Sequence, residues 1–314
     1  MTLQLYLHFP FCKSKCLYCD FCSAPGSRAE MERYTAALRR EIVQAGREYP
    51  NAEISTAYLG GGTPSILPPD LMASVLESLR IAFSFQPNVE FSSEANPGTL
   101  TPEWLECVRC HGVNRLSMGV QAVQDELLRS LGRVHTFRQA EEAFQLPREA
   151  GFSRLSADLM FALPGQSLSD FRESIHRVAT LGAEHISAYS LIVEEGTPLA
   201  SRAASGAVRI PDEDEAADFY QLGLQELSCL GYQQYEISNF AITSATGRVR
   251  TIWGWGSAPI VCCPHGTKKK KPGHFISAPP IFPIRLTIAA PWKKKIRLRR
   301  AANPSPAKKP CSRP

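Results

Sequence analysis

Residues 7–19 read LHFPFCKSKCLYC, in which the end of an apolar strand leads into three cysteines spaced as C-x3-C-x2-C. Thiolates are the soft ligands that iron–sulfur clusters require, so Cys12, Cys16 and Cys19 are candidate cluster ligands. Three thiolates on a four-iron cubane leave one iron open to a small chelating molecule. A structural zinc site with Cys22 as fourth ligand is one alternative, and a disulfide pair is another. The spacing favours the cluster, because zinc ligands usually come as two separate cysteine pairs.

Outward from this stretch, short apolar segments alternate with amphipathic helical patterns up to about residue 240. The predicted strands cover Leu3–His8, Ser55–Gly60, Val89–Ser93, Arg115–Val120, Leu155–Ala162, His185–Ile192 and Gln233–Ile237. The predicted helices cover Glu30–Tyr49, Asp70–Phe83, Phe137–Gly151, Ser167–Leu181 and Asp212–Leu230. Strands spaced roughly 25–35 residues apart are typical of βα units and predict a parallel sheet with helices outside.

Six or seven such units predict an α/β fold with a partial, TIM-like (β/α) barrel. An open doubly wound sheet is the alternative. In a barrel the chemistry lies at the C-terminal ends of the strands, here beneath the cysteine stretch. We expect the barrel over residues 1–200, a short α/β extension over 201–242 and a separate tail over 243–314.

A glycine run, GGGTP at residues 60–64, follows the second predicted strand. Glycines let the backbone approach a ligand closely and expose its N–H and C=O groups. The segment is not a P-loop, because no Gly-Lys-Ser/Thr follows it. For an isolated run of this kind, a plain tight turn is the alternative.

Polar residues also stand at or after the next three strands. Glu94 ends the third strand, Gln121 and Arg133 follow the fourth, and Asp158 lies within the fifth. A carboxylate at the C-terminal end of a strand points into the predicted site, although a surface acid at a turn gives the same pattern. A charged residue inside an apolar strand needs a partner or a ligand, so Asp158 is either a site residue or a structural buried carboxylate.

The cysteine motif after the first strand, with the aromatic Tyr18 before its last cysteine, resembles the radical S-adenosylmethionine (SAM) superfamily. The strings YLHFPFC (residues 6–12), LMFALPGQ (159–166), EEGTPL (194–199) and YEISNF (235–240) resemble its coproporphyrinogen-dehydrogenase-like branch. The resemblance is collinear over residues 3 to about 241. It implies a [4Fe–4S] cluster whose open iron is chelated by SAM, with the hard chemistry belonging to that cofactor.

The resemblance also implies particular SAM contacts, carried over residue by residue. In this superfamily a GGGTP-like loop contacts the methionine amino group. The implied contacts are Tyr6, Gly62, Thr63, Pro64, Glu94, Gln121, Arg133, Asp158, the main-chain carbonyl of Tyr18 and the region of Ile192.

Two kinds of protein within this branch compete as interpretations, so enzymatic activity stays open. One is the HemW-type heme chaperone, which implies heme or porphyrin, a flavodoxin- or ferredoxin-type electron donor and a heme-acceptor protein as partners. The other is the oxygen-independent coproporphyrinogen III dehydrogenase, which oxidatively decarboxylates two propionates. That enzyme has a long segment before its cysteine motif and a cysteine where Phe21 stands here. These differences, with the ANPGT and EEGTPL strings, favour the HemW-type interpretation.

The composition changes abruptly near residue 242. Residues 1–242 contain 19 Lys and Arg against 30 Asp and Glu, whereas residues 243–314 contain 16 Lys and Arg and no acidic residue. HemW-like chains continue here with a His-Asn segment associated with heme binding, and this sequence does not. We hypothesise a reading-frame shift that replaced the native continuation, so a truncated, non-functional product is a third interpretation. The basic tail is expected to be disordered and without a specific nucleic-acid partner.

The chain shows no secretory signal and no apolar run long enough to span a membrane, which predicts a cytoplasmic protein. Clustered cysteines in a reducing cytosol favour metal chemistry over disulfides. The pair Cys107 and Cys110 has the spacing of a redox or zinc pair. It lies on a predicted helix without a second pair nearby, which favours packing against the core.

Overall fold

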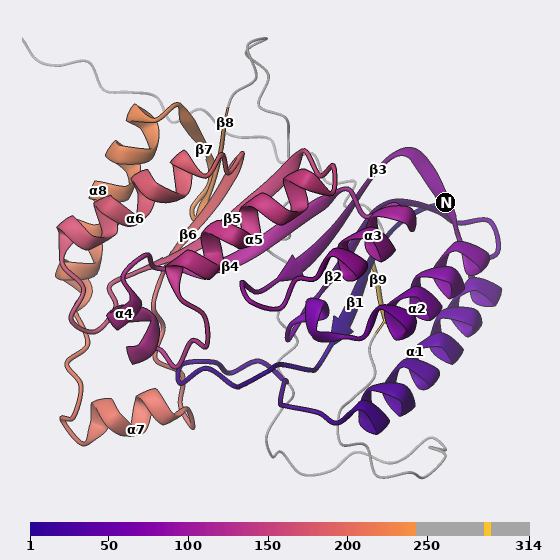
Figure 1. The fold of residues 1–314 in the computed structure, drawn as a ribbon, viewed down its shortest axis with the longest axis horizontal. Coiled ribbons are helices and arrows are strands. Elements are labelled where there is room, and N and C mark those ends of the chain that lie inside the picture. The colour runs from indigo at the N-terminus through magenta and orange to yellow at the C-terminus, as the bar shows by residue number, and fades with distance from the viewer. Residues whose placement is uncertain (243–285, 290–314) are drawn as a thin grey trace, which may run out of the picture.

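The computed structural model describes residues 1–242 and 286–289, whose strands form one nine-stranded sheet (Figure 1). The strands are β1 (Thr2–Phe9), β2 (Glu53–Gly61), β3 (Ser84–Ala95), β4 (Arg115–Gln121), β5 (Arg154–Phe161), β6 (His185–Ser190), β7 (Tyr232–Glu236), β8 (Asn239–Ile242) and β9 (Leu286–Ala289). Their order across the sheet is β7-β8-β6-β5-β4-β3-β2-β1-β9.

Strands β1 to β6 are parallel and lie side by side in chain order. A doubly wound sheet would reverse its strand order at a switch point, and this sheet does not. The prediction of a partial (β/α) barrel is therefore confirmed. Beyond β6 the sheet continues with β8 and then β7, each antiparallel to its neighbour.

The helices are α1 (Arg28–Glu48), α2 (Pro69–Ala82), α3 (Pro102–Cys110), α4 (Asp125–Ser130), α5 (Phe137–Glu149), α6 (Leu168–Thr180), α7 (Pro198–Ala204) and α8 (Glu213–Cys229). In Figure 1 the helices α1, α2, α3, α5, α6 and α8 lie along one side of the sheet, and α4 and α7 stand apart near one end. Four of the eight begin with capping boxes, as in Ser27 with Glu30 of α1. Reciprocal side-chain and backbone bonds of this kind fix where a helix starts.

Alternating burial gives the sheet two unlike faces. Along β1, the residues Leu3, Leu5, Leu7 and Phe9 are buried, while the intervening residues are only partly buried. The buried set joins the main apolar core with the inner sides of the helices. The opposite face, called the polar face below, carries Tyr6, Tyr58, Glu90, Glu94, Arg115, Ser117, Ser156, Asp158, His185 and Ser187.

A second group of buried side chains lies apart from the main core. This small apolar cluster consists of Ala122, Leu127, Leu128, Leu131, Met160, Leu163, Leu191 and Leu199. Its members come from α4, α7, the end of β5 and the loops that follow β4, β5 and β6. It therefore packs at the C-terminal ends of the strands, where a barrel places its chemistry.

Two strand predictions need correction. β3 begins at Ser84 rather than Val89, because an irregularity in its pairing with β2 accommodates the stretch that includes Pro87. β8 was not predicted, since the turn between β7 and β8 contains Ile237 and Ser238 rather than a glycine signal.

The expected disordered tail lies outside the described residues except for β9. There Leu286–Ala289 pairs antiparallel with β1, although no strand was expected in that region. Four residues are too short to show an alternating pattern, whereas the edge of β1 offers unpaired backbone groups. Among the described residues, no helix has the length and apolarity needed to cross a membrane.

Candidate functional site

The three cysteines lie on one long loop, residues 10–27, between β1 and α1, called the cysteine loop below. Its two limbs are joined where the N–H of Cys12 donates to the carbonyl of Ala24 at 3.1 Å. In Figure 1 this indigo loop runs from the end of β1 toward α4 and α7 and returns to α1. The thiols of Cys12, Cys16 and Cys19 are half-buried, and Cys22 is exposed.

The GGGTP segment holds the start of the cysteine loop by backbone contacts. The N–H of Gly62 donates to the carbonyl of Phe9 at 2.7 Å, and the N–H of Thr63 donates to that of Phe11 at 2.8 Å. A Cβ on Gly62 would meet the carbonyl oxygen of Phe11 at 2.6 Å and the Sγ of Cys12 at 3.0 Å. Only glycine fits this approach, because real Cβ atoms do not come so close to backbone oxygen. The Oγ1 of Thr63 lies 3.6 Å from the Sγ of Cys12.

Arg133 connects the cysteine loop to the ends of β3 and β4. Its Nη1 donates to the Sγ of Cys16 at 3.6 Å. Its Nη2 donates to the Oδ1 of Asn96 at 2.8 Å and to the carbonyl of Gly119 at 2.6 Å. Its Nε is buried without a hydrogen-bond partner among the described residues. Burial lowers the pKa of Arg133, but the nearby Tyr18 and Cys16 outweigh it and the net shift is upward.

Two carboxyl groups, Glu94 and Asp158, stand on the polar face, and no cation among the described residues is bonded to either. Glu94 accepts from the hydroxyl of Tyr58 at 2.9 Å and from the N–H of Gly61 at 3.1 Å. Burial, followed by repulsion from Asp158, raises the pKa of Glu94 to about 7. Burial raises the pKa of Asp158 to about 6, and hydrogen bonds from Ser187 and Ser117 only partly offset it. Because desolvation dominates both shifts, further hydrogen bonds from a bound ligand would stabilise the ionised form of each acid.

The remaining predicted contacts surround the same end of the sheet. Gln121 ends β4 with a positive φ of 70°, and its Oε1 accepts from the hydroxyl of Tyr189 at 3.2 Å. Tyr6 stacks on Tyr58 with ring centroids 6.0 Å apart. Pro64 is buried at the start of a short 3-10 turn. By contrast, the side chain of Ile192 is 67% exposed two residues beyond β6.

Sequence reasoning missed three residues that support this site. Asn96 joins two predicted contacts, because its Nδ2 donates to the Oγ1 of Thr63 at 2.8 Å while its Oδ1 accepts from Arg133. The sequence offered one indication of Asn96: residues two positions apart along a strand point to the same face, and Asn96 stands two positions after Glu94. Tyr58 and Tyr189 fix Glu94 and Gln121, and their partners lie on other strands, which no local pattern reveals.

The cysteine set fits a cluster better than a single metal ion. Within the described part of the chain, no three His, Cys, Asp or Glu side chains converge as ligands of one ion. A cubane takes each thiolate at a different iron, so its ligands stand farther apart. The pKa of the Cys19 thiol is raised, mainly by burial and further by Cys16 and Cys12, so the thiols lie within electrostatic reach of one another. Arg133 supplies a compensating positive charge beside Cys16.

The pair Cys107 and Cys110 lies on α3, away from this end of the sheet. Cys107 packs against the main core and its thiol donates to the carbonyl of Pro69 at 3.4 Å, while Cys110 is exposed. The packing interpretation is confirmed for Cys107.

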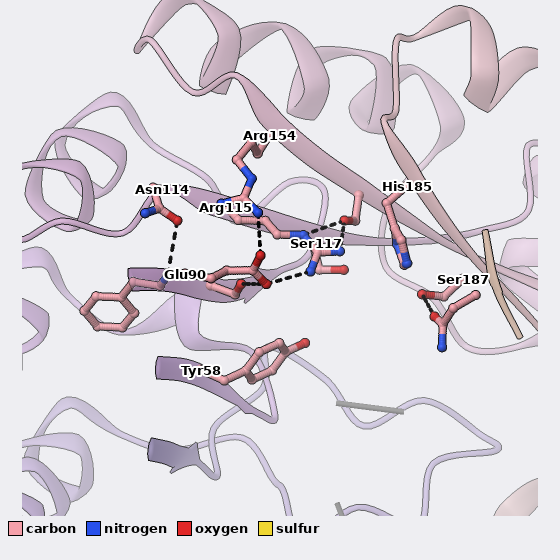
Figure 2. A network of polar contacts seen from close by, with 12 residues as sticks. Tyr58, Glu90, Asn114, Arg115, Ser117, Arg154, His185 and Ser187 are labelled. Atoms are coloured by element: carbon pink, nitrogen blue, oxygen red, sulfur yellow. Dashed lines mark hydrogen bonds and ion pairs between the residues drawn. The ribbon is translucent and has the colours of Figure 1, made fainter. Parts of the chain in front are cut away.

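A second group of charges occupies the opposite, N-terminal end of the polar face. Figure 2 shows Glu90 between the guanidinium groups of Arg115 and Arg154. Arg115 lies 3.2 Å from Glu90 and also donates to the Oγ of Ser156. His185 follows on β6, and its Nε2 lies 2.9 Å from the hydroxyl of Tyr235. The charges at this end are bonded mainly to one another.

Comparison with known proteins shows the family of the chain and the likeness of its fold. Residues 6–178 match the family model of the radical SAM superfamily. The chain is 38% identical over 237 residues to the heme chaperone HemW of Bacillus subtilis (strain 168), which covers 75% of this chain and 62% of that protein. It is 37% identical over 263 residues to the heme chaperone HemW of Mycobacterium tuberculosis (strain H37Rv), covering 81% and 67%.

Among solved structures, coproporphyrinogen III oxidase (HemN) from Escherichia coli, described as a radical SAM enzyme, matches with a TM-score of 0.70. The sequences are 28% identical, and the match covers 77% of this chain and 56% of that one. The chain thus spans less than two thirds of its Bacillus relative and little more than half of the solved oxidase. By its motif, its fold and these likenesses, the chain belongs to the radical SAM superfamily, and within it to the family of the HemW proteins.

Proposed function

We propose that Cys12, Cys16 and Cys19 bind a [4Fe–4S] cluster and that the surrounding strand ends hold SAM at its open iron. When bound, a reduced cluster of this kind supplies the electron that cleaves the SAM sulfonium. The observation that carries the proposal is Arg133, which reaches Cys16 and Asn96 while its Nε stays buried and unpaired among the described residues. A buried, unpaired cationic N–H is costly, and a ligand carboxylate would satisfy it.

The chain's own groups would divide the ligand between them. Arg133 would pair with the SAM carboxylate, and the backbone of Gly62 and Thr63 would meet its amino group. Glu94 and Asp158, with raised pKa values, would accept hydrogen bonds from sugar hydroxyls. The remaining sides of the SAM site would be formed by Tyr6, Pro64, Gln121, the carbonyl of Tyr18 and the backbone near Ile192.

For the whole protein we favour a heme-carrying role, in which heme or a porphyrin is received and passed to an acceptor protein. The support is the likeness to relatives named heme chaperones, which this chain matches over about two thirds of their length. A flavodoxin- or ferredoxin-type protein in the cytoplasm would reduce the cluster. In HemW-like chains the segment associated with heme binding follows the position of residue 242. This sequence lacks that segment, so the heme-carrying role is proposed for the protein with its native continuation.

Oxidative decarboxylation of coproporphyrinogen is the second candidate, and the match to the solved oxidase at a TM-score of 0.70 favours it. Anaerobic incubation with coproporphyrinogen III, SAM and a reductant separates the two. Product formation would favour the oxidase, whereas heme binding by absorbance titration without turnover would favour the carrier.

Anaerobic reconstitution with iron and sulfide tests the cluster. The wild-type chain should show the EPR signal of a reduced [4Fe–4S] cluster, and Cys12→Ala, Cys16→Ala and Cys19→Ala should each abolish it. Cys110→Ala is the matched control, because that thiol is exposed on α3. A normal signal in all three variants would refute the ligand assignment.

We also propose that a reading-frame shift near codon 242 produced the basic tail, which would make this chain a truncated product. Sequencing the coding DNA across codons 235–260 tests it. An alternative frame that continues the family's sequence would support the shift, and its absence would exclude it. Heme titration of a chain with the restored continuation would then show what the tail replaced.

A further inference from the structure

The residue between Cys16 and Tyr18 is held from both sides by backbone hydrogen bonds. The N–H of Leu17 donates to the carbonyl of Leu131 at 2.9 Å, and the carbonyl of Leu17 accepts from the N–H of Leu199 at 2.9 Å. Leu131 is the C-cap of α4, and Leu199 lies in the first turn of α7. Both helix groups have no partner within their own helix, so they are available to the loop.

The side chains at this point join the same structure. Leu17 and Tyr18 pack on the small apolar cluster, which includes both Leu131 and Leu199. Leu199 is 1% exposed, although α7 stands apart from the other helices (Figure 1). The cysteine loop is therefore attached to a cluster that is separate from the main core. A small separate cluster can loosen without unfolding of the main core.

Gly132 brings α4 close enough to hold the loop. It has a φ of +74°, and an added Cβ would lie 2.9 Å from the Cγ of Leu17 and 3.1 Å from its backbone N. Gly206, after α7, has nearly the same φ of +72° but nothing within 4 Å of the added Cβ. The two glycines share a backbone requirement, and only Gly132 touches the cysteine loop.

We infer that α4 and α7 form a clamp on Leu17, in which Gly132 and Leu199 are positioning residues for the cluster ligands Cys16 and Cys19. The EEGTPL segment contributes Leu199 and the N-cap Thr197, whose hydroxyl accepts from the N–H of Ala200 at 3.2 Å. This segment thereby acts on the cluster through Leu17 rather than through a ligand of its own. The inference rests on the proposed cluster for its effect on iron, and on the described contacts for its effect on the loop.

The test compares Gly132→Ala with Gly206→Ala. Both place alanine in the left-handed region, so both should lose thermal stability, and only Gly132→Ala should also displace Leu17. In the reconstituted protein, Gly132→Ala should speed cluster loss to an iron chelator roughly ten-fold and alter the EPR g values, since outer-shell changes weaken metal retention by about that factor. Gly206→Ala should stay within about two-fold of wild type.

A second readout uses the chain without its cluster. Lys13 and Lys15 are exposed on the cysteine loop, so trypsin reports how firmly that loop is held. Gly132→Ala should be cut there several-fold faster than wild type, and Gly206→Ala should not. Equal behaviour of the two variants in both assays would overturn the clamp. A wild-type chain that takes up no iron would instead refute the proposed cluster, and the trypsin comparison would still decide the clamp.

Leu199→Ala provides a second variant if Gly132→Ala does not fold. It removes packing from the small apolar cluster but keeps the backbone N–H. Leu227→Ala in α8 is its control, because Leu227 is equally buried in the main core. Leu199→Ala should speed cluster loss and loop cleavage, Leu199→Met should restore both, and Leu227→Ala should change neither. Faster loss and cleavage in Leu227→Ala to the same extent would show a general stability effect and overturn the inference.

Discussion

Both ends of the polar face carry largely buried acidic side chains, but among the described residues only the acid at the N-terminal end is paired with arginines. At the N-terminal end, Glu90 takes both Arg115 and Arg154, and Arg115 also bonds Ser156 (Figure 2). At the C-terminal end, burial raises the pKa values of Glu94 and Asp158, Asp158 raises that of Glu94 further, and neither carboxyl group is bonded to a cation among the described residues. A network in which every charge is paired (a closed network) stabilises a fold. A network with buried acids that have no cation partner (an open network) is a candidate ligand site.

The same contrast separates the two apolar groups. The main core runs under the whole sheet from β1 to β8, and the small apolar cluster holds only the C-terminal strand ends and the cysteine loop. Stability and site geometry can therefore be changed separately in this molecule. Four substitutions test that separation, starting with the largest expected effect.

Glu90→Gln should break the closed network. It leaves Arg115, whose side chain is 6% exposed, without its carboxylate, and losing one partner of a buried pair costs roughly 3–5 kcal/mol of unfolding free energy. Urea titration of the cluster-free chain measures the loss. Glu226→Gln removes the carboxylate partner of Arg172, whose side chain is 50% exposed, and should cost at most about 1 kcal/mol. A cost for Glu90→Gln no larger than this control would contradict the contrast between the two ends.

Arg133→Lys should act on the open network instead. Lysine keeps the charge but loses the planar fork that reaches Cys16, Asn96 and Gly119 together. We expect SAM affinity, measured per bound cluster, to fall about 10–100-fold, the equivalent of a lost charge-assisted hydrogen bond. Equilibrium dialysis with labelled SAM measures it, with Arg129→Lys on exposed α4 surface as control. Unchanged SAM affinity would remove Arg133 from the site.

Glu94→Gln should flatten part of the pH dependence of stability in the cluster-free chain. The pKa of Glu94 is raised from 4.5 to about 7, so the folded state keeps a proton that the unfolded chain releases. Its contribution to stability is present below about pH 4.5 and is lost as the pH rises to about 7. The difference between variant and wild type should therefore grow in favour of the variant, by on the order of 1–2 kcal/mol, between about pH 5 and pH 7.5.

Urea titrations at those two pH values measure this change, with Glu226→Gln as control because the hydrogen bond from Arg172 lowers the pKa of that carboxyl. A variant whose pH profile runs parallel to wild type would show that Glu94 is ionised in the fold.

Cys22→Ser should have the smallest effect and sharpen the ligand set. The thiol is exposed, so the unfolding free energy should change by less than about 0.5 kcal/mol. Iron content and the reduced EPR signal should match wild type. Loss of the signal would make Cys22 a ligand and revive the four-thiolate alternative.

Much of the fold followed from local pattern. The alternation of short apolar segments and helical periods placed β1, β2, β4, β5, β6 and β7 and the five longest helices to within about two residues at most of their ends. N-cap residues such as Ser27 and Asp212 indicate where those helices start. β8 and β9 were not predicted. β8 follows a turn without a glycine signal and pairs with β6, and β9 pairs with β1, which is distant in sequence.

The common location of the candidate site residues was also predicted from the sequence, again because of strand positions. Residues after parallel strands converge at one edge, so strand position indicated that Thr63, Glu94, Gln121 and Arg133 lie at the same end of the sheet. The family resemblance then implied that they contact SAM. Which of them touch could not be known. Arg133 and Cys16 are 117 positions apart in the sequence. Asn96 joins Arg133 to Thr63, but no sequence motif singled it out as a site residue.

The sequence by itself determined the cysteine spacing, the strand and helix periods and the glycine run, because these depend on neighbouring residues and on the intrinsic geometry of the chain. Only the tertiary structure decided that Glu90 is paired with arginines while Glu94 accepts hydrogen bonds from uncharged donors, and that Leu17 is held between α4 and α7. Hydrogen bonding and burial depend on partners from remote strands and loops, so their satisfaction appears only once the sheet has formed.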